Sequence, residues 1–298
     1  MRGLYMPIMR KAHTQHRIDP EQPVRIFPAF RSATVVQGSI TVWVTALSEF
    51  GSFPLKGKSE AGCLADIASR LLSKEEVETF IRFRDEKAAH LYLAAHSMAR
   101  RVLHHTRPAF GMTDPLLRTA YGKPYLPGQT DAQPLHFSLT HAWPVAAVAI
   151  TEAEECGIDV EMRAAGDEWQ DFGPDVLHPE DLAEILMASD PQAAFIRCWT
   201  QKEAVSKAAG LGLQWDFASF HVCPRTGSVR TRDSGEPIVV KTVHCSHLYP
   251  FLDGWLSIAC RAPDGNMPPI VIQPLASGEQ FQLPEINTNN HKDGLCAP

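Results

Sequence analysis

Residues 195–213 read Phe-Ile-Arg-Cys-Trp-Thr-Gln-Lys-Glu-Ala-Val-Ser-Lys-Ala-Ala-Gly-Leu-Gly-Leu, and this stretch decides our interpretation of the chain. It is predicted as a helix with well-marked ends. Asp190 is a good N-cap, and Pro191 suits the first helical position. Gly210 stands where a left-handed C-terminal cap normally falls. The sequence therefore predicts a helix that runs from Pro191 to the residue before Gly210.

Trp199, Glu203 and Lys207 follow one another four residues apart, so they lie along one ridge of the predicted helix. A tryptophan at the base of this ridge would screen the Glu203–Lys207 pair from water, and charged groups interact strongly where the local dielectric is low. The alternative is an ordinary surface pair, which stabilises a helix by about 0.3–0.5 kcal/mol. A second acidic cluster upstream favours the catalytic interpretation.

This second cluster is Gly157-Ile-Asp-Val-Glu161. If the segment is a strand, Ile158 and Val160 face one side, and Asp159 and Glu161 face the other. Two carboxylates on one strand face repel each other unless a positive charge lies between them. Mg²⁺ binds a few carboxylates together with phosphate oxygens, so it is the natural candidate. Taken by itself, the pattern also fits the exposed polar face of an edge strand.

Composition narrows the class of protein. The chain has 298 residues, of which 44% are hydrophobic and 21% charged, as in a soluble globular protein with one large or two small domains. A net charge of −6 argues against a general nucleic-acid binder. The 7 cysteines are odd in number and form no Cys-x-x-Cys pair, which favours reduced thiols in a cytoplasmic protein. The densest apolar run, residues 145–150, is too short to span a membrane.

Other segments show the periodicity of strands and helices. Residues 40–47 alternate and are rich in β-branched side chains, which predicts a strand. Ser73-Lys-Glu-Glu76 is a capping-box pattern that opens a helix to about residue 83. Further helices are predicted at about residues 85–105 and 179–186, and further strands at about 135–141, 145–151, 237–242 and 255–260.

Two further segments are candidates for binding. In the turn-rich loop at residues 121–127, Pro124 favours an extended backbone at Lys123, which presents the lysine side chain outward. Thr140 and His141 come at the end of a predicted strand. By itself a Thr-His pair is weak evidence, and a structural histidine is the alternative.

Four of these segments stand in a fixed order along the chain. They are Gly122-Lys-Pro124, Phe137-Ser-Leu-Thr-His141, Gly157-Ile-Asp-Val-Glu161 and Trp199-Thr-Gln-Lys-Glu-Ala-Val-Ser-Lys207. This order resembles the 4′-phosphopantetheinyl transferase superfamily, specifically its larger surfactin-type (Sfp-like) branch, over about residues 38–262. The chain departs from the family pattern at Thr140, where serine is usual. It also lacks the family's lysines before the first long helix, where Arg82 and Arg84 are the nearest cations.

The resemblance implies a mixed α/β (α+β) fold of two similar α/β halves. Each half would be an antiparallel sheet packed with a long helix, and a pseudo-twofold would relate the two. Coenzyme A would lie in the cleft between them. The expected division is a disordered extension at residues 1–37, an N-terminal half at 38–152, a C-terminal half at 153–262 and a loose C-terminal tail at 263–298.

The implied reaction transfers the 4′-phosphopantetheine arm of coenzyme A to a serine of an apo carrier protein and releases adenosine 3′,5′-bisphosphate. Mg²⁺, for which Mn²⁺ can substitute, would be held by Asp159, Glu161 and Glu203. Glu203 would take the serine proton, directly or through a water, and Lys207 would assist the leaving phosphate. The residues that the resemblance assigns to coenzyme binding are Lys123, Pro124, Thr140, His141, Lys202 and Lys207.

The partner would be an acyl or peptidyl carrier, and carriers of fatty-acid, polyketide and non-ribosomal peptide synthesis all fit. We expect a cytoplasmic monomer that binds neither nucleic acid nor membrane. Two other functions stay open: a catalytically inactive protein that binds coenzyme A or a carrier, and a Mg-dependent hydrolase of nucleotide pyrophosphates. A zinc site at His244-Cys-Ser-His247 is disfavoured, because its spacing fits no common zinc motif.

Overall fold

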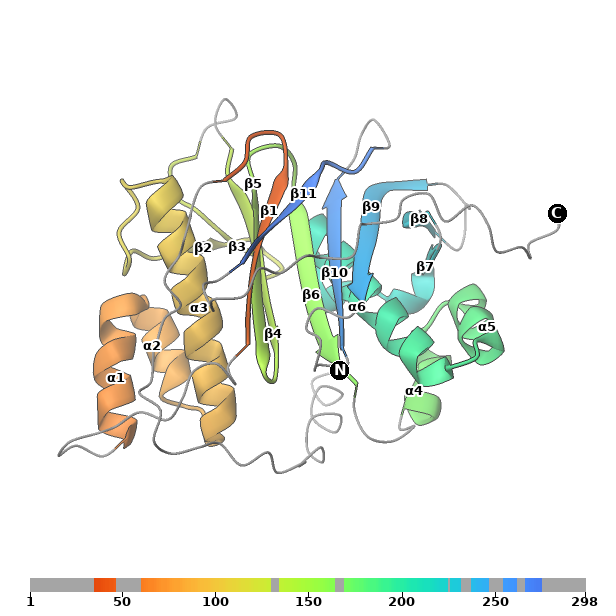
Figure 1. The fold of residues 1–298 in the computed structure, drawn as a ribbon, viewed down its shortest axis with the longest axis horizontal. Helices are drawn as coiled ribbons and strands as arrows, with labels where there is room; N and C mark the ends of the chain where they lie inside the picture. Colours follow the sequence, from red (N-terminus) through yellow and green to blue (C-terminus); the bar gives the residue numbers. More distant parts are fainter. Residues whose placement is uncertain are drawn as a thin grey trace.

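The computed structural model describes residues 35–46, 60–129, 134–163, 169–224, 226–231, 237–246, 254–261 and 266–274. In these residues the strands form two large sheets and a short hairpin (Figure 1). Sheet one has the strand order β11-β1-β5-β4, and sheet two has the order β6-β10-β9-β8-β7.

The bounds of the elements are as follows. Sheet one contains β1 (Ile40–Ala46), β4 (His136–Ala142), β5 (Val145–Thr151) and β11 (Ile270–Pro274). Sheet two contains β6 (Cys156–Met162), β7 (Phe220–Val222), β8 (Ser228–Thr231), β9 (Pro237–Ser246) and β10 (Gly254–Arg261). The hairpin pairs β2 (Leu117–Arg118) with β3 (Pro124–Tyr125). The α-helices are α1 (Glu60–Leu71), α2 (Lys74–Phe80), α3 (Glu86–Thr106), α4 (Trp169–Val176), α5 (Pro179–Met187) and α6 (Pro191–Ala209).

The two sheets pack against each other, and a long helix covers each outer face (Figure 1). Apolar side chains of β1 and β5 meet those of β6 and β10 between the sheets. On the outer face of sheet one, α3 packs onto Trp43, Phe137 and Val148. On the outer face of sheet two, Ala204 and Ala208 of α6 pack with Ala259 of β10. The layers therefore follow the order α3, sheet one, sheet two, α6.

This architecture confirms the predicted mixed α/β fold, with a sheet and a long helix in each part. Local sequence signals explain the agreement. Ser73 and Glu76 form the predicted capping box at the start of α2, and Asp85 caps α3. All neighbouring strands paired in the described residues are antiparallel except β1 and β11, which are parallel. The pseudo-twofold stays an implication of the resemblance.

One segment corrects the expected loose tail. Within residues 263–298, the segment 270–274 forms β11, which pairs with β1 so that Ile270 lies beside Ile40 and Ile272 beside Val42. Ile270 and Ile272 pack against the core between the sheets, and this apolar burial explains why the chain returns to sheet one. Residues 1–34 of the expected extension and 275–298 of the tail lie outside the described residues. No helix in the described residues is long and apolar enough to cross a membrane.

Candidate active site

Strand β6 separates its apolar and acidic side chains as the sequence predicts. Ile158 and Val160 are buried in the core between the sheets. The intervening positions face α6, and Asp159 is buried there while Glu161 is half-buried. Asp159 therefore lies against the helix that carries the other candidate residues, which the alternative of a freely exposed polar strand face does not explain.

Helix α6 begins and ends where its sequence signals place it. Asp190 accepts a hydrogen bond from the backbone N–H of Ala193 through Oδ1 at 3.0 Å, and Gly210 closes the helix with φ of 73°. Trp199 stacks on Phe195 and meets Phe217 edge-on. The helix carries few exposed side chains, because β6, β9, β10 and α5 all contact it.

Lys207 and Thr140 both bind the Asp159 carboxylate. Lys207 Nζ lies 2.6 Å from Asp159 Oδ1 and donates to the backbone oxygen of Ile158 at 3.1 Å. Thr140 Oγ1 donates to Asp159 Oδ1 at 3.0 Å and accepts from the backbone N–H of Val160 at 3.2 Å. The threonine thus keeps the hydroxyl that the family's serine would supply, and it links the edge of sheet one to β6. The structure thus brings Thr140 and Lys207 together at the same oxygen of Asp159.

Burial raises the pKa of all three carboxylates, and the charge of Asp159 adds to the shift at Glu161 and Glu203. Burial and the charges of Asp159 and Glu203 raise the pKa of Glu161 to about 8. Burial and the charge of Asp159 raise the pKa of Glu203 to about 7, although Lys207 opposes this shift. Burial also raises the pKa of Asp159, against the opposing effect of Lys207. The site therefore has more negative charge than its single lysine neutralises.

Two oxygens at this site have the character of ligand atoms. Asp159 Oδ2 and Glu203 Oε1 are buried and have no hydrogen-bond partner among the described residues. Unsatisfied buried carboxylate oxygens are costly, and a divalent cation that takes oxygen ligands would satisfy both. The donor set of Asp159, Glu161 and Glu203 therefore fits the predicted Mg²⁺.

His141 lies on the α3 side of sheet one. Phe137 and Leu139 of β4 pack with α3. His141 is two residues beyond Leu139, so it belongs to the same face of the strand. Burial, the charge of His96 and the charge of Lys207 together lower the pKa of His141 to about 4, so its imidazole is neutral at pH 7. The side chain is half-buried, at a point where α3, β4 and α6 all contribute charge.

Lys123 directly precedes β3, and its side chain contacts the beginning of β6. Its ammonium forms an ion pair with Glu155 and donates to the backbone oxygen of Cys156 at 3.2 Å. His136 also pairs with Glu155, at 3.2 Å. Burial alone would raise the pKa of Glu155, but His136 and Lys123 lower it to about 2. These contacts hold the Lys123 ammonium at the start of β6, the strand that carries Asp159. Pro124, the next residue, begins β3.

Lys202 is a correction to the expected coenzyme-binding set. Its side chain is fully buried, with Nζ 2.6 Å from Asp181 Oδ2 and donating to the backbone oxygen of Phe217 at 2.8 Å and to that of Phe220. It also lies over the Phe220 ring, 4.2 Å from the centroid. Adjacent helical residues point about 100° apart, so Lys202 enters the core beside α5 while Glu203 faces β6.

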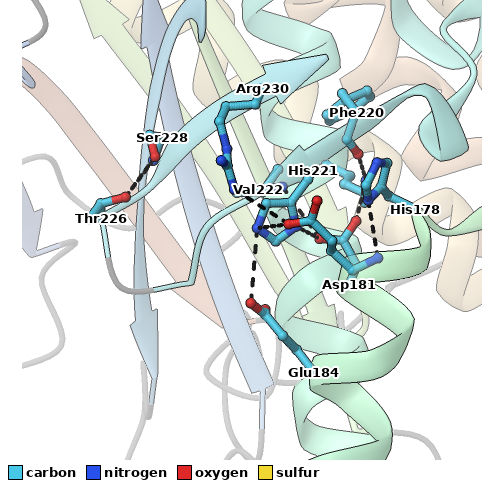
Figure 2. A network of polar contacts seen from close by, with 11 residues as sticks. His178, Asp181, Glu184, Phe220, His221, Val222, Thr226, Ser228 and Arg230 are labelled. Atoms are coloured by element: carbon cyan, nitrogen blue, oxygen red, sulfur yellow. Dashed lines mark hydrogen bonds and ion pairs between the residues drawn. The ribbon is translucent and has the colours of Figure 1, made fainter. Parts of the chain in front are cut away.

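A polar network around Asp181 was not foreseen from the sequence (Figure 2). His221 Nδ1 lies 2.6 Å from Asp181 Oδ1, and His178 is close by at the N-cap of α5. In the described residues, His178, Asp181 and His221 are the one group of possible metal ligands whose ligand atoms all lie within 4.8 Å of one another; the carboxylates of Asp159, Glu161 and Glu203 are not so close. Because Lys202 already supplies a cation to Asp181, we interpret this group as a structural ion-pair network.

The charge of His221 predicts a pH-dependent contribution to stability. Burial alone lowers its pKa, but the hydrogen bond and charge of Asp181 and the charges of Glu184 and Glu180 raise the pKa above 6.5. A folded-state pKa above the unfolded value gives stability that is present below the unfolded pKa and is lost as pH rises through the folded pKa. The unfolding free energy of the wild type, minus that of His221→Asn, should therefore fall as pH rises above 6.5.

Urea denaturation of both proteins across this pH range measures that difference. Asn is the suitable replacement because its amide can still donate to Asp181 but does not titrate. His105→Asn, a change at an exposed position of α3, is the control and should leave the pH dependence unchanged. A difference between wild type and His221→Asn that stays flat or grows with pH would contradict a charged His221.

Part of the sequence is similar to a known protein family. Residues 155–256, from the start of β6 into β10, match the family model described as the 4′-phosphopantetheinyl transferase superfamily. All three candidate carboxylates, Lys207 and the buried network around Asp181 lie within the residues that are similar to this superfamily.

Two relatives show how far the similarity extends. The chain is 33% identical over 107 residues to the 4′-phosphopantetheinyl transferase AcpT of Salmonella typhimurium, across 35% of this chain and 55% of the relative. It is 27% identical over 206 residues to a 4′-phosphopantetheinyl transferase of Bacillus subtilis, across 65% of this chain and 84% of the relative. The chain thus spans about half the length of the Salmonella relative and most of the Bacillus one.

Proposed function

We propose that this protein transfers the 4′-phosphopantetheine arm of coenzyme A to a serine of an apo acyl or peptidyl carrier protein, and that it belongs to the surfactin-type branch. The observation that carries the proposal is the contact of β6 with α6, where Asp159, Glu161 and Glu203 form an acidic site beside Lys207. The match of residues 155–256 to the transferase superfamily supports it, as does the long similarity to the Bacillus protein.

The acidic residues would hold Mg²⁺ or Mn²⁺. Asp159 and Glu203 each have a buried carboxylate oxygen without a partner in the described residues, and Glu161 adds a third carboxylate. When bound, the ion would supply positive charge to the coenzyme's pyrophosphate oxygens. The raised pKa values of Glu161 and Glu203 fit this role, because they report carboxylates that repel one another without a cation between them.

Glu203 would act as the general base for the carrier serine. Its carboxylate has a buried oxygen without a hydrogen-bond partner in the described residues, and a positioned carboxylate can accept a proton directly or through a water. Lys207 would stabilise the phosphate that leaves as adenosine 3′,5′-bisphosphate. Its position one helical turn beyond Glu203 and its contact with Asp159 keep the ammonium at the acidic site.

The coenzyme would lie between the two sheet-and-helix units, with His141 and Thr140 near its phosphates and Lys123 with Pro124 at its nucleotide end. The half-buried position of His141, where the charges of His96 on α3 and Lys207 on α6 both act, supports this placement. We further propose halves at residues 38–152 and 153–262, a monomeric protein and a cytoplasmic location. Four cysteines of the described residues, Cys156, Cys198, Cys223 and Cys260, are free thiols, which fits a reducing compartment.

The deciding experiment is a mass assay with coenzyme A and a panel of purified apo acyl and peptidyl carriers. At least one carrier should gain the mass of one phosphopantetheine arm, and adenosine 3′,5′-bisphosphate should appear in equal amount. Exhaustive chelation should abolish the gain, and added Mg²⁺ should restore it. Release of nucleotide without any carrier would indicate a pyrophosphate hydrolase. Coenzyme A binding without turnover would indicate an inactive binding protein, and full activity after chelation would contradict the metal assignment.

A further inference from the structure

His96 on α3 has a fixed orientation and one ring nitrogen left for a ligand. Its Nδ1 lies 2.9 Å from Glu76 Oε1, and its ring stacks on Tyr92 with centroids 3.9 Å apart and planes 26° from parallel. Among the described residues, Glu76 is the one hydrogen-bond partner of the ring, and the side chain keeps 13% of its surface exposed. With Nδ1–H donating to the carboxylate, Nε2 is the atom that solvent or a ligand reaches.

Several contacts fix the carboxylate of Glu76, the hydrogen-bond partner of His96. Its carboxylate accepts from the backbone N–H of Ser73 at 3.0 Å in the capping box and also binds Arg100 Nε. Burial alone would raise the pKa of Glu76, but the hydrogen bonds and charges of His96 and Arg100 lower it to about 2. Arg100 is in turn fixed by the backbone oxygens of Met112 and Asp114, each at 2.8 Å. The orientation of His96 is therefore set by a chain of buried contacts.

His96 also lies within electrostatic range of His141 at the candidate active site. Helix α3 packs on β4 through Phe137, and His141 continues the same face of that strand. The charges of His96 and Lys207 both act on His141, so the three side chains are within electrostatic range. They come from α3, β4 and α6, and each carries nitrogen donors. Asp159 and Glu203 provide the opposite charge, which acts on Lys207.

We propose that His96 is a further phosphate-binding residue of this site, which contacts a phosphate of the ligand through Nε2 while His141 and Lys207 reach the same group. This inference rests on the proposed function for the identity of the ligand, coenzyme A. The chemistry it requires is more general, namely a phosphate or pyrophosphate group near His141 of β4, where charges of α3 and α6 both act. Glu76 would accept from Nδ1–H of His96, and Nε2–H would donate to a phosphate oxygen when both ring nitrogens carry a proton.

Two isosteric variants separate the two ring nitrogens. The amide of His96→Asn falls where Nδ1 lies, so it keeps the Glu76 contact and loses the outward nitrogen. The amide of His96→Gln reaches the place of Nε2, so it keeps an outward donor. We expect His96→Asn to weaken binding of coenzyme A and of inorganic pyrophosphate by about 10- to 100-fold, as for a lost hydrogen bond to a charged group. His96→Gln should recover most of that loss.

Isothermal titration calorimetry with coenzyme A and with inorganic pyrophosphate measures these affinities, and thermal unfolding checks that each variant folds. His105→Asn is the matched control, because His105 is exposed in the last turn of the same helix. Its affinities should equal those of the wild type. If His96→Asn does not fold, the histidine NMR signals of the wild type decide: pyrophosphate should shift the His96 ring signals, and unshifted signals would overturn the proposal.

The other outcomes separate this inference from the proposed function. A wild type that transfers the arm, with His96→Asn binding coenzyme A normally, overturns the role of His96 alone. A wild type that binds pyrophosphate through His96 but modifies no carrier overturns the transferase function alone. A wild type that binds neither coenzyme A nor pyrophosphate overturns both.

Discussion

Glu203→Gln is expected to lower the turnover of carrier modification by about 10²–10⁴-fold at saturating coenzyme A and Mg²⁺, the contribution of a positioned general base. A neutral amide does not accept the serine proton and is a poor ligand for a hard cation. The pKa of Glu203, about 7 in the folded protein, shows that its surroundings already hold the group near the point of proton exchange. The loss should appear in turnover measured by mass, while the melting temperature stays near or above that of the wild type, because the variant removes a repulsive buried charge.

Lys207→Met tests the other end of the same helix pair. It removes the electrostatic contact to the leaving phosphate, for which a loss of about 10²–10³-fold in turnover is typical. It also leaves Asp159 without its 2.6 Å ion-pair partner, so the variant should be less stable, unlike Glu203→Gln. Glu78→Gln, at an exposed position of α2, is the control and should keep normal turnover. Near-normal rates for both site variants would mean that α6 is not the catalytic element.

The elements at this site were predictable because their signals are local. Asp190, Pro191 and Gly210 mark the ends of α6 within the chain itself, and each occupies its predicted place. The alternation of β6 likewise sends Ile158 and Val160 into the core and turns Asp159 toward α6. Period and capping depend on neighbouring residues, so one sequence is enough to recognise them.

Lys202 shows where local signals fail. A charged residue next to Glu203 is expected to share its surroundings, yet it lies fully buried against Asp181, Phe217 and Phe220. The sequence pattern of α6 suggests one apolar stripe that packs on one side. In the structure, strands of sheet two and helix α5 both contact the helix. Which polar side chain meets which partner is then decided by elements far away in the chain, and nothing near residue 202 indicates them.

The network of Asp181 and His221 and the phosphate-binding role proposed for His96 were missed for the same reason. Asp181 and His221 are 40 residues apart, and Glu76 and His96 are 20 apart. The capping box identified Glu76 as a helix-capping residue, which is correct but incomplete. The carboxylate of Glu76 also binds His96 and Arg100 of α3. A signal was present in His96 itself, a histidine on the packed helix α3, but only the fold shows that Glu76 of α2 orients its ring.

Gly157→Ala is expected to disrupt the site without touching a functional side chain. An added Cβ would lie 2.0 Å from the backbone oxygen of Ala204 and 2.5 Å from the backbone nitrogen of Ala208. Both atoms belong to the backbone of α6, so no side-chain rotation relieves the clash, and the helix must move away from β6. Overpacking of a close core contact costs about 1–3 kcal/mol or more. The Lys207–Asp159 contact and the Glu203 carboxylate lie on the part of the helix that must move.

Urea denaturation and the carrier mass assay measure the two consequences. The unfolding free energy should fall by at least about 1–3 kcal/mol, and turnover should fall by roughly 100-fold, as expected for a displacement of about 1 Å between reacting groups. Gly173→Ala in α4 is the control, because its nearest neighbours are side-chain carbons at 3.2–3.8 Å that can adjust. Wild-type stability together with wild-type turnover in Gly157→Ala would contradict the close approach of β6 and α6, and with it the geometry that places the three carboxylates beside Lys207.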